Sequence, residues 1–226
     1  MKHLLLQVTE NVVDQTTTQS EGLSLFDLFQ KGGFIMYPIA LLSIISIYFF
    51  IERYLTIKKA AKIDSNFMAN IKDMITNGNI KGAKALCERN NTPFARMIEK
   101  GVARIGRPLK NIEVGLESVG KLEIYKLEKT VFVLSTIAAI APMFGFLGTV
   151  FGMIKTFYNI SQTANITIDA IAGGIYIKMV SSAAGLIVGL MSYVFYNYLN
   201  SMIDKVVNQM EIVSFEFLDL LQEPAR

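Results

Sequence analysis

Three hydroxyl side chains stand in stretches that are otherwise almost wholly apolar. Thr149 lies in "APMFGFLGTVFG" at residues 141–152, and Ser181 and Ser182 lie in "KMVSSAAGLIVG" at residues 178–189. In a membrane, such a hydroxyl can bond a carbonyl of its own helix and hold the structure together, or it can line a path along which a proton moves. The residue types alone leave both interpretations open.

Small residues recur in the same two stretches at helical spacing. In lipid no hydrophobic force draws helices together, so close approach of backbones at small side chains takes its place. We expect the following positions to pack helices: Ala141, Pro142, Gly145, Gly148, Gly152, Gly185 and Gly189. Pro142 is also expected to kink its helix, because it removes a backbone hydrogen bond. We expect such faces to have no use in a monomer, so the pattern predicts a homo-oligomer.

Ionisable side chains are nearly absent from these stretches. A proton relay inside a membrane ordinarily uses Asp, Glu, His, Lys or Arg at depth. Here there is only Lys178, near one end of its apolar stretch. Its amine could pair with a carboxylate of a partner or extend to the lipid headgroups. If protons cross the membrane through this protein, another chain must supply the titrating group.

The composition argues against most enzyme chemistry. The 226 residues are 52% hydrophobic and include one cysteine, Cys87, and one histidine, His3. One cysteine cannot form an intrachain disulfide, and a single histidine near the start of the chain cannot build a histidine-based metal site or a Ser/His/Asp triad. We therefore expect no enzyme activity, no cofactor and no metal. The net charge of +3, with no basic stripe, predicts no nucleic-acid partner.

Three stretches are long and apolar enough to cross a bilayer: residues 34–51, 130–154 and 179–199. Backbone groups in lipid must be satisfied internally, so each is expected to be a helix. The sequence therefore predicts an all-α integral membrane protein. The first stretch has no small-residue face and is expected to contact the lipid bilayer.

Lys and Arg residues set the expected orientation. They are frequent just after the first predicted span and just before the second. The flanking segments are accordingly predicted to be a periplasmic segment with a short amphipathic helix (1–33), a cytoplasmic helical domain (52–129), a periplasmic connection (155–178) and a cytoplasmic C-terminal helix (200–226). A bacterial inner membrane fits this arrangement.

The C-terminal segment carries a stripe of apolar residues at alternating spacings of 3 and 4. Its members are Ile203, Val206, Met210, Val213, Phe217 and Leu220. This spacing is typical of a helix that packs along another helix. The partner helix could belong to the same chain or to another subunit, and the pattern does not distinguish them.

The two apolar stretches resemble a known family. "APMFGFLGTVFGMI" followed by "KMVSSAAGLIVGLMSYVFYNYL" is similar to the motifs of the ExbB/TolQ/MotA proton-channel stator subunits. The three-span layout favours the ExbB/TolQ branch, and the chain most resembles ExbB.

That resemblance implies a five-fold ring whose pore is lined by the second and third spans. The pore would hold the spans of a smaller single-span partner, like ExbD or TolR, whose membrane aspartate carries the proton. Thr149, Ser181 and Ser182 would be pore-lining hydroxyls, and the glycines would let five copies approach. The ring, driven by the proton-motive force, would act with a TonB-like protein to energise outer-membrane transport. Alternatives are a TolQ-like role in the Tol-Pal envelope system and a membrane scaffold that conducts nothing.

Two positions depart from the family pattern. The family's paired threonines are replaced by Ser181 and Ser182, which keep the hydroxyl but lose the methyl group that restricts its rotamer. Relatives like ExbB often carry a glutamate about where this chain has Ile177 and Lys178. The identity of the transported ion and its entrance therefore stay open.

Overall fold

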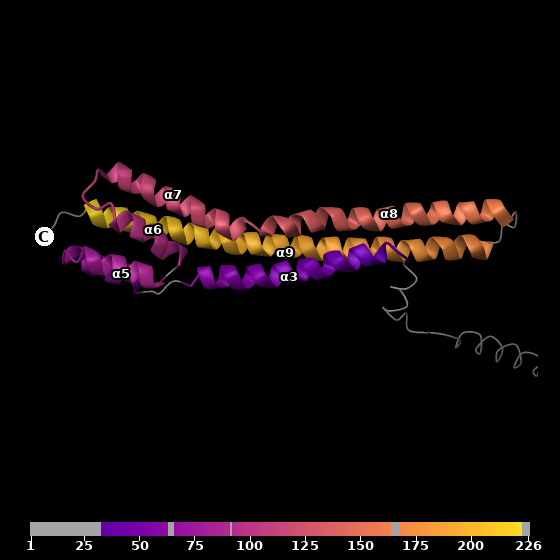
Figure 1. The fold of residues 1–226 in the computed structure, drawn as a ribbon, viewed down its shortest axis with the longest axis horizontal. Helices are drawn as coiled ribbons and strands as arrows, with labels where there is room; N and C mark the ends of the chain where they lie inside the picture. Colours follow the sequence, from indigo (N-terminus) through magenta and orange to yellow (C-terminus); the bar gives the residue numbers. More distant parts are fainter. Residues whose placement is uncertain (1–32, 63–65, 91, 164–167, 223–226) are drawn as a thin grey trace, which may run out of the picture. The chain divides into compact units, whose positions relative to one another are not determined.

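A computed structural model describes residues 33–62, 66–90, 92–163 and 168–222. Within these ranges every regular element is an α-helix, as Figure 1 shows. The helices are α3 (Met36–Ala60), α4 (Phe67–Thr76), α5 (Ile80–Asn90), α6 (Pro93–Val102), α7 (Leu109–Glu128), α8 (Val131–Thr163) and α9 (Ile168–Gln222). The amphipathic helix expected within residues 1–33 lies outside the described part of the chain, apart from Gly33.

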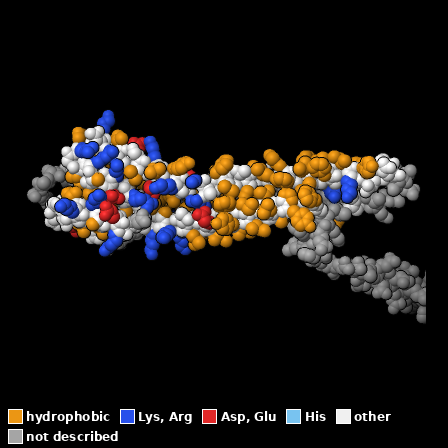
Figure 2. Space-filling view, viewed as in Figure 1, with side chains coloured by type: hydrophobic (Ala, Val, Ile, Leu, Met, Phe, Trp, Pro, Cys, Tyr) orange, Lys and Arg blue, Asp and Glu red, His pale blue; other side chains and the backbone are white. Residues whose placement is uncertain are grey.

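Three helical regions are long and apolar enough to span a membrane, as the sequence predicts. They lie in α3, in Leu109–Gln162 and in Ile171–Gln222. Figure 2 shows apolar side chains covering the parts of α3, α8 and α9 that contain the predicted spans, and charged ones gathered over α5, α6 and α7. The prediction of an all-α membrane protein is confirmed.

The long helices extend beyond the predicted spans. Residues 155–163 and 168–178, predicted as a connection, are helical continuations of α8 and α9. The predicted third span and the predicted C-terminal helix are one helix, α9. No proline interrupts α9, so nothing forces its backbone to break where the sequence changes from apolar to mixed. α8 also stays helical along its length, although it contains Pro142.

The chain divides into two compact units, which are described separately. Unit 1 comprises residues 1–40 and 141–187, and unit 2 comprises residues 41–140 and 188–226. Unit 1 therefore contains the first turns of α3 and the paired parts of α8 and α9 that carry the predicted site. Unit 2 contains α4 to α7 and the remaining parts of the three long helices.

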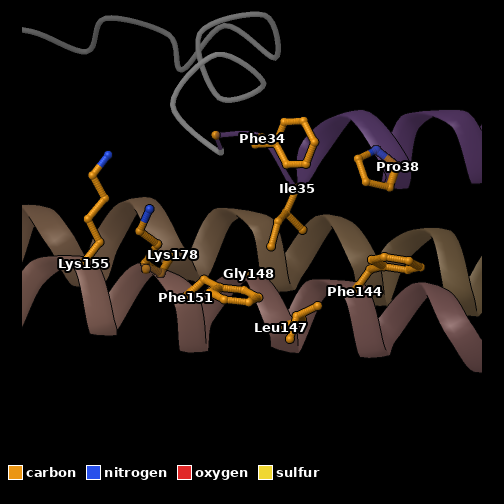
Figure 3. A pocket seen from close by; sticks show the side chains of 11 residues that line it. Phe34, Ile35, Pro38, Phe144, Leu147, Gly148, Phe151, Lys155 and Lys178 are labelled. Atoms are coloured by element: carbon orange, nitrogen blue, oxygen red, sulfur yellow. The ribbon is translucent and has the colours of Figure 1, made fainter.

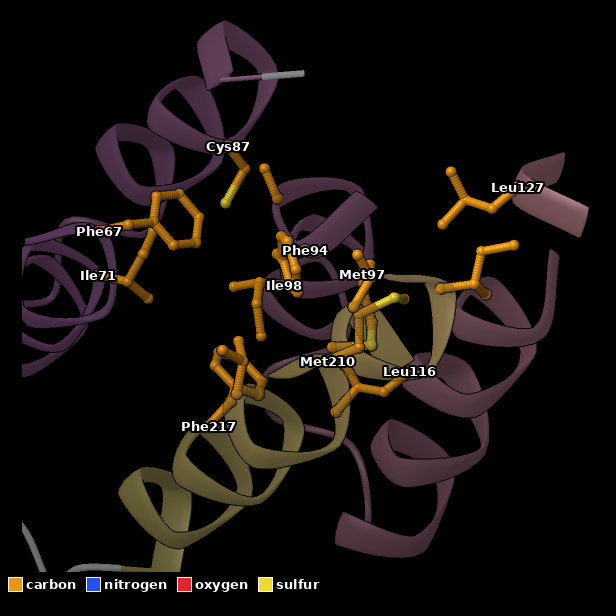
Figure 4. Close-up of a cluster of buried hydrophobic side chains, with 14 of the residues drawn as sticks. Phe67, Ile71, Cys87, Phe94, Met97, Ile98, Leu116, Leu127, Met210 and Phe217 are labelled. Carbon is orange, nitrogen blue, oxygen red and sulfur yellow. The ribbon is translucent and has the colours of Figure 1, made fainter. Parts of the chain in front are cut away.

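Unit 2 has a core built around α6 and the C-terminal part of α9. Phe94 and Ile98 of α6, Leu116 of α7 and Phe217 of α9 are all buried in it, and Figure 4 shows how they converge. α6 begins sharply because the Thr92 hydroxyl accepts a hydrogen bond from the N–H of Ala95, at 3.3 Å. This core anchors the end of α9.

The same core answers the question about the C-terminal stripe. Ile203, Val206, Met210, Val213 and Phe217 are buried among residues of their own chain, and Leu220 is half-buried. A Cβ atom placed on Gly101 would lie 2.5 Å from the ring of Phe217, so α6 and α9 approach closely. The stripe therefore packs within the subunit.

Candidate functional site

Within unit 1, α8 and α9 touch through their backbones at three small residues. A Cβ atom placed on Gly185 would lie 2.6 Å from the carbonyl oxygen of Ala141 and 2.8 Å from the Cα atom of Gly145. A Cβ atom on Gly145 would lie 3.0 Å from the carbonyl oxygen of Ser182. At Gly185 only a residue without a side chain fits such an approach, and at Gly145 a larger residue would force the neighbouring backbone to move. These small residues thus pack α8 against α9 of the same chain.

This finding corrects one expectation. The small-residue faces were expected to have no use in a monomer, and that is wrong, because α8 and α9 of the same chain occupy them. Periodicity places small residues on one face of a helix but does not say which helix covers that face. The glycine pattern by itself is therefore no argument for an oligomer.

Two further glycines of α8 make room for side chains of α9. A Cβ atom on Gly148 would lie 2.6 Å from the Ser181 hydroxyl and 3.3 Å from a methyl group of Ile35. A Cβ atom on Gly152 would overlap the aliphatic part of Lys178. Gly148 and Gly152 therefore let Ser181 and Lys178 lie against the α8 backbone. Among the other predicted packing residues, Gly189 is buried in unit 2 and Pro142 is half-buried.

The three predicted hydroxyls lie near the same contact but differ in their hydrogen bonds. The Thr149 hydroxyl donates to the carbonyl of Phe146 at 2.6 Å. The Ser181 hydroxyl is buried and donates to the carbonyl of Lys178 at 2.9 Å. Both bonds are the local helix bonds expected of structural hydroxyls. The described residues offer no hydrogen-bond partner to the hydroxyl of Ser182, which is half-buried.

Sequence reasoning missed a buried hydroxyl pair in unit 2. Ser46 of α3 and Ser192 of α9 are fully buried, and their hydroxyl oxygens lie 2.8 Å apart. The Ser192 hydroxyl also donates to the carbonyl of Val188 at 2.8 Å. A hydroxyl has one proton to give, so Ser46 is the donor in the pair. A serine within the first apolar stretch could have indicated such a contact. Ser43 also lies in this stretch but is not fully buried, so the sequence alone does not single out Ser46.

One face of the first span fits the expected contact with lipid, while the other docks on α9. Leu41, Ile44, Tyr48 and Ile51 expose large apolar side chains. Ser46 is a single small polar residue buried on the docked face.

The site contains no carboxylate of its own. The apolar stretches of α3, α8 and α9 hold no Asp, Glu or His, and their one cation is Lys178. Over the described ranges, no group of three or more His, Cys, Asp or Glu side chains could hold a metal ion. What the α8 and α9 pair offers chemically is a set of hydroxyl groups in an apolar surrounding.

Comparison with known proteins identifies the family. Residues 89–212, which run from the end of α5 through most of α9, match the MotA/TolQ/ExbB proton channel family. The chain belongs to this proton channel family. The matched region includes every residue of the α8 and α9 contact described above.

Individual relatives of this family member carry ExbB names. The "Putative biopolymer transport protein ExbB homolog" of Methanothermobacter thermautotrophicus is 24% identical over 191 residues, covering 84% of this chain and 68% of the relative. The "Biopolymer transport protein ExbB" of Aquifex aeolicus is 36% identical over 74 residues, covering 33% and 50%. The protein of that name from Neisseria meningitidis is 42% identical over 67 residues, covering 30% of each chain. All three names are those of biopolymer transport proteins.

Proposed function

We propose that this family member is the multi-span subunit of a channel driven by the proton-motive force, and that it energises TonB-dependent transport across the outer membrane. The observation that carries the proposal is a hydroxyl-bearing contact between α8 and α9 in apolar stretches that contain no acid or histidine. Such a contact can conduct protons only if another chain supplies the titrating group. The proposed partner is an ExbD-like single-span protein with an aspartate in its span.

Several features support the finer parts of the proposal. The ExbB names of the relatives favour the TonB system over a TolQ-like role. The charged surface over α5 to α7 fits a cytoplasmic domain, with the N-terminus periplasmic and the C-terminus cytoplasmic in a bacterial inner membrane. A homo-pentamer around the partner, coupled to a TonB-like protein, is the assembly proposed. Each proton would release about 2.3 kcal/mol per 100 mV of membrane potential.

The hydrogen bonds suggest distinct roles for two hydroxyls. Thr149 already donates its proton to Phe146, but its oxygen keeps lone pairs. It can therefore accept a hydrogen bond from water or from the protonated form of the partner's aspartate. Ser182 has its proton to give and can stabilise the ionised form. Ser181, buried against Gly148, would position α9 rather than touch the partner.

The decisive test replaces Thr149 by valine. Thr149→Val keeps the shape of the side chain and removes the polar atom, so we expect the complex to assemble with its partner but to lose proton uptake. Thr136→Val is the matched control, because Thr136 makes the same kind of bond on the same helix, to the carbonyl of Phe132 at 3.0 Å. The measurement is voltage-driven proton uptake into liposomes that contain the chain with its partner, together with recovery of the complex.

The two readouts separate the alternatives. If the Thr149 hydroxyl only bonds its own helix, valine should cost little, because a membrane hydrogen bond contributes only about 0.6 kcal/mol. Normal proton uptake in Thr149→Val would therefore remove this residue from the proton pathway. Failure to assemble would assign the hydroxyl a structural role. Ser182→Ala should lose uptake as Thr149→Val does, and Ser43→Ala should have no effect.

A further inference from the structure

Unit 1 contains a cavity of about 510 Å³ that the proposed proton pathway does not use. The residues just before α3, the first turn of α3 and one face of α8 form its walls, and Figure 3 shows Phe34, Ile35, Leu147 and Phe151 around it. All of these side chains are apolar, and Gly148 leaves space between them. Its size is within the range of about 300–1,000 Å³ that is usual for sites that hold a small molecule.

Two cations stand at one end of this cavity. Lys155 of α8 and Lys178 of α9 both line it, and Figure 3 shows their amines directed to the same side. Neither amine has a hydrogen bond or an ion pair within the described ranges, where the ion pairs all lie outside unit 1. Among the residues that the structure describes, this pair of cations beside an apolar hollow therefore has no counter-charge.

The contacts between the helices show that this end of the cavity lies where the apolar stretches end. Ile35, just before α3, packs against Gly148, and Lys178 packs against Gly152, so the residues that lead into α3 and these parts of α8 and α9 lie at one level. The apolar stretch of α8 ends at Ile154, immediately before Lys155. In a bilayer this is the level of the lipid headgroups, where long basic side chains place their charge. The hollow itself then lies at the depth of the acyl chains.

From this geometry we infer that the cavity binds an anionic phospholipid of the bilayer. An acyl chain lies among Phe34, Ile35, Leu147 and Phe151, and the phosphate lies between Lys155 and Lys178. An apolar hollow open to lipid offers water no hydrogen-bonding partners, so a chain of methylene groups fills it instead. The two cations favour a lipid with net negative charge over a zwitterionic one. The inference holds whether or not the chain conducts protons.

The protein contains no tryptophan, which permits a direct test. Phe151→Trp places a single fluorophore in the cavity wall, and Phe132→Trp places one on an exposed part of α8 in unit 2. Each full-length variant is reconstituted in vesicles with increasing fractions of either phosphatidylglycerol or phosphatidylcholine carrying brominated acyl chains, which quench tryptophan on contact. We expect the Phe151→Trp protein to be quenched by the anionic lipid at a mole fraction roughly tenfold lower. The Phe132→Trp protein should respond to both lipids equally.

Charge variants in the Phe151→Trp background assign the effect to the two lysines. Replacing both by glutamine should remove the preference for the anionic lipid, and replacing both by arginine should keep it. Lys155→Gln alone, at an exposed position, should reduce the preference without disturbing the packing of Lys178 on Gly152. It provides the test if the double variant does not reconstitute.

Three results would overturn the inference. Equal quenching of the Phe151→Trp protein by both lipids would show that the cations select nothing. No quenching by either lipid would show that protein, such as the segment before Gly33, fills the cavity. An unchanged preference in Lys155→Gln would show that the phosphate lies elsewhere.

Discussion

At the scale of single residues, Glu123 is the most constrained charge in the described chain. Its side chain is 3% exposed, and it accepts hydrogen bonds from Arg96 of α6 and, at 2.7 Å, from Lys126 of α7. Burial alone would raise the pKa of Glu123, but the hydrogen bonds and charges of the two cations outweigh it, so its pKa lies below the ordinary value. Glu123 thereby ties α6 to α7 beneath the proposed membrane boundary.

Glu123→Gln should lower the melting temperature in detergent by about 5 °C, because a buried hydrogen bond to a charged group contributes about 2 kcal/mol. A lowered pKa stabilises the fold above the ordinary pKa of glutamate, and this contribution is lost as the pH falls through the pKa of the folded state. The difference between wild type and variant should therefore be constant near neutral pH and shrink below about pH 4. Glu117→Gln, which removes an exposed ion pair with Lys121, is the control and should change little. A difference that persists at low pH would contradict this role of the charge.

At the scale of elements, α3 docks on α9 in unit 2 through a polar pair and a group of aromatic rings, Phe50 and Tyr54 of α3 with Phe195 and Tyr198 of α9. The Ser46 and Ser192 hydroxyls form the polar pair. The rings of Phe50 and Phe195 stack with centroids 4.0 Å apart and an interplanar angle of 14°. Because hydrophobic force does not hold helices together in lipid, such specific contacts determine where the first span lies.

Ser46→Leu should detach α3 from α9, because a large side chain at a fully buried position forces the two helices apart. The expected cost is about 1–3 kcal/mol, seen as a lower melting temperature and faster proteolysis after α3. Ser43→Leu introduces the same side chain one turn earlier, at a position that is not fully buried, and should be tolerated. Equal stability of the two variants would mean that the serine pair does not set the docking of α3.

At the scale of the whole molecule, apolar side chains are exposed outside the predicted spans as well as within them. In unit 2, Val114, Leu122 and Tyr125 form an exposed stripe on α7, and Ile212 and Phe215 are exposed on α9. Lipid covers the spans but would not reach these residues if they are cytoplasmic, as proposed. Exposed apolar stripes of this kind typically mark a protein interface. With the glycine faces occupied inside the subunit, this surface is the better candidate for contact between copies.

Leu122→Glu should therefore lower the mass of the assembly in mild detergent, because it places a charge at the centre of the α7 stripe. Lys110→Glu, at an exposed position on the same helix, should leave the mass unchanged. Native mass spectrometry of both variants beside the wild type measures the number of copies. An undisturbed assembly in Leu122→Glu would exclude α7 as an interface between copies.

The sequence by itself determined that the protein is helical, that three stretches can span a membrane and that the pattern around Gly145, Thr149 and Ser182 is that of a proton channel family. The first two conclusions follow from local physics, because backbone groups in lipid must be satisfied within a helix. The third rests on the resemblance of the motifs to those of the family. Only the tertiary structure decided that α9 itself covers the α8 glycines, that Ser46 rather than Ser43 is buried and that Lys155 and Lys178 share one cavity. Helical periodicity places a residue on a face, whereas the element that covers this face comes from a distant part of the chain.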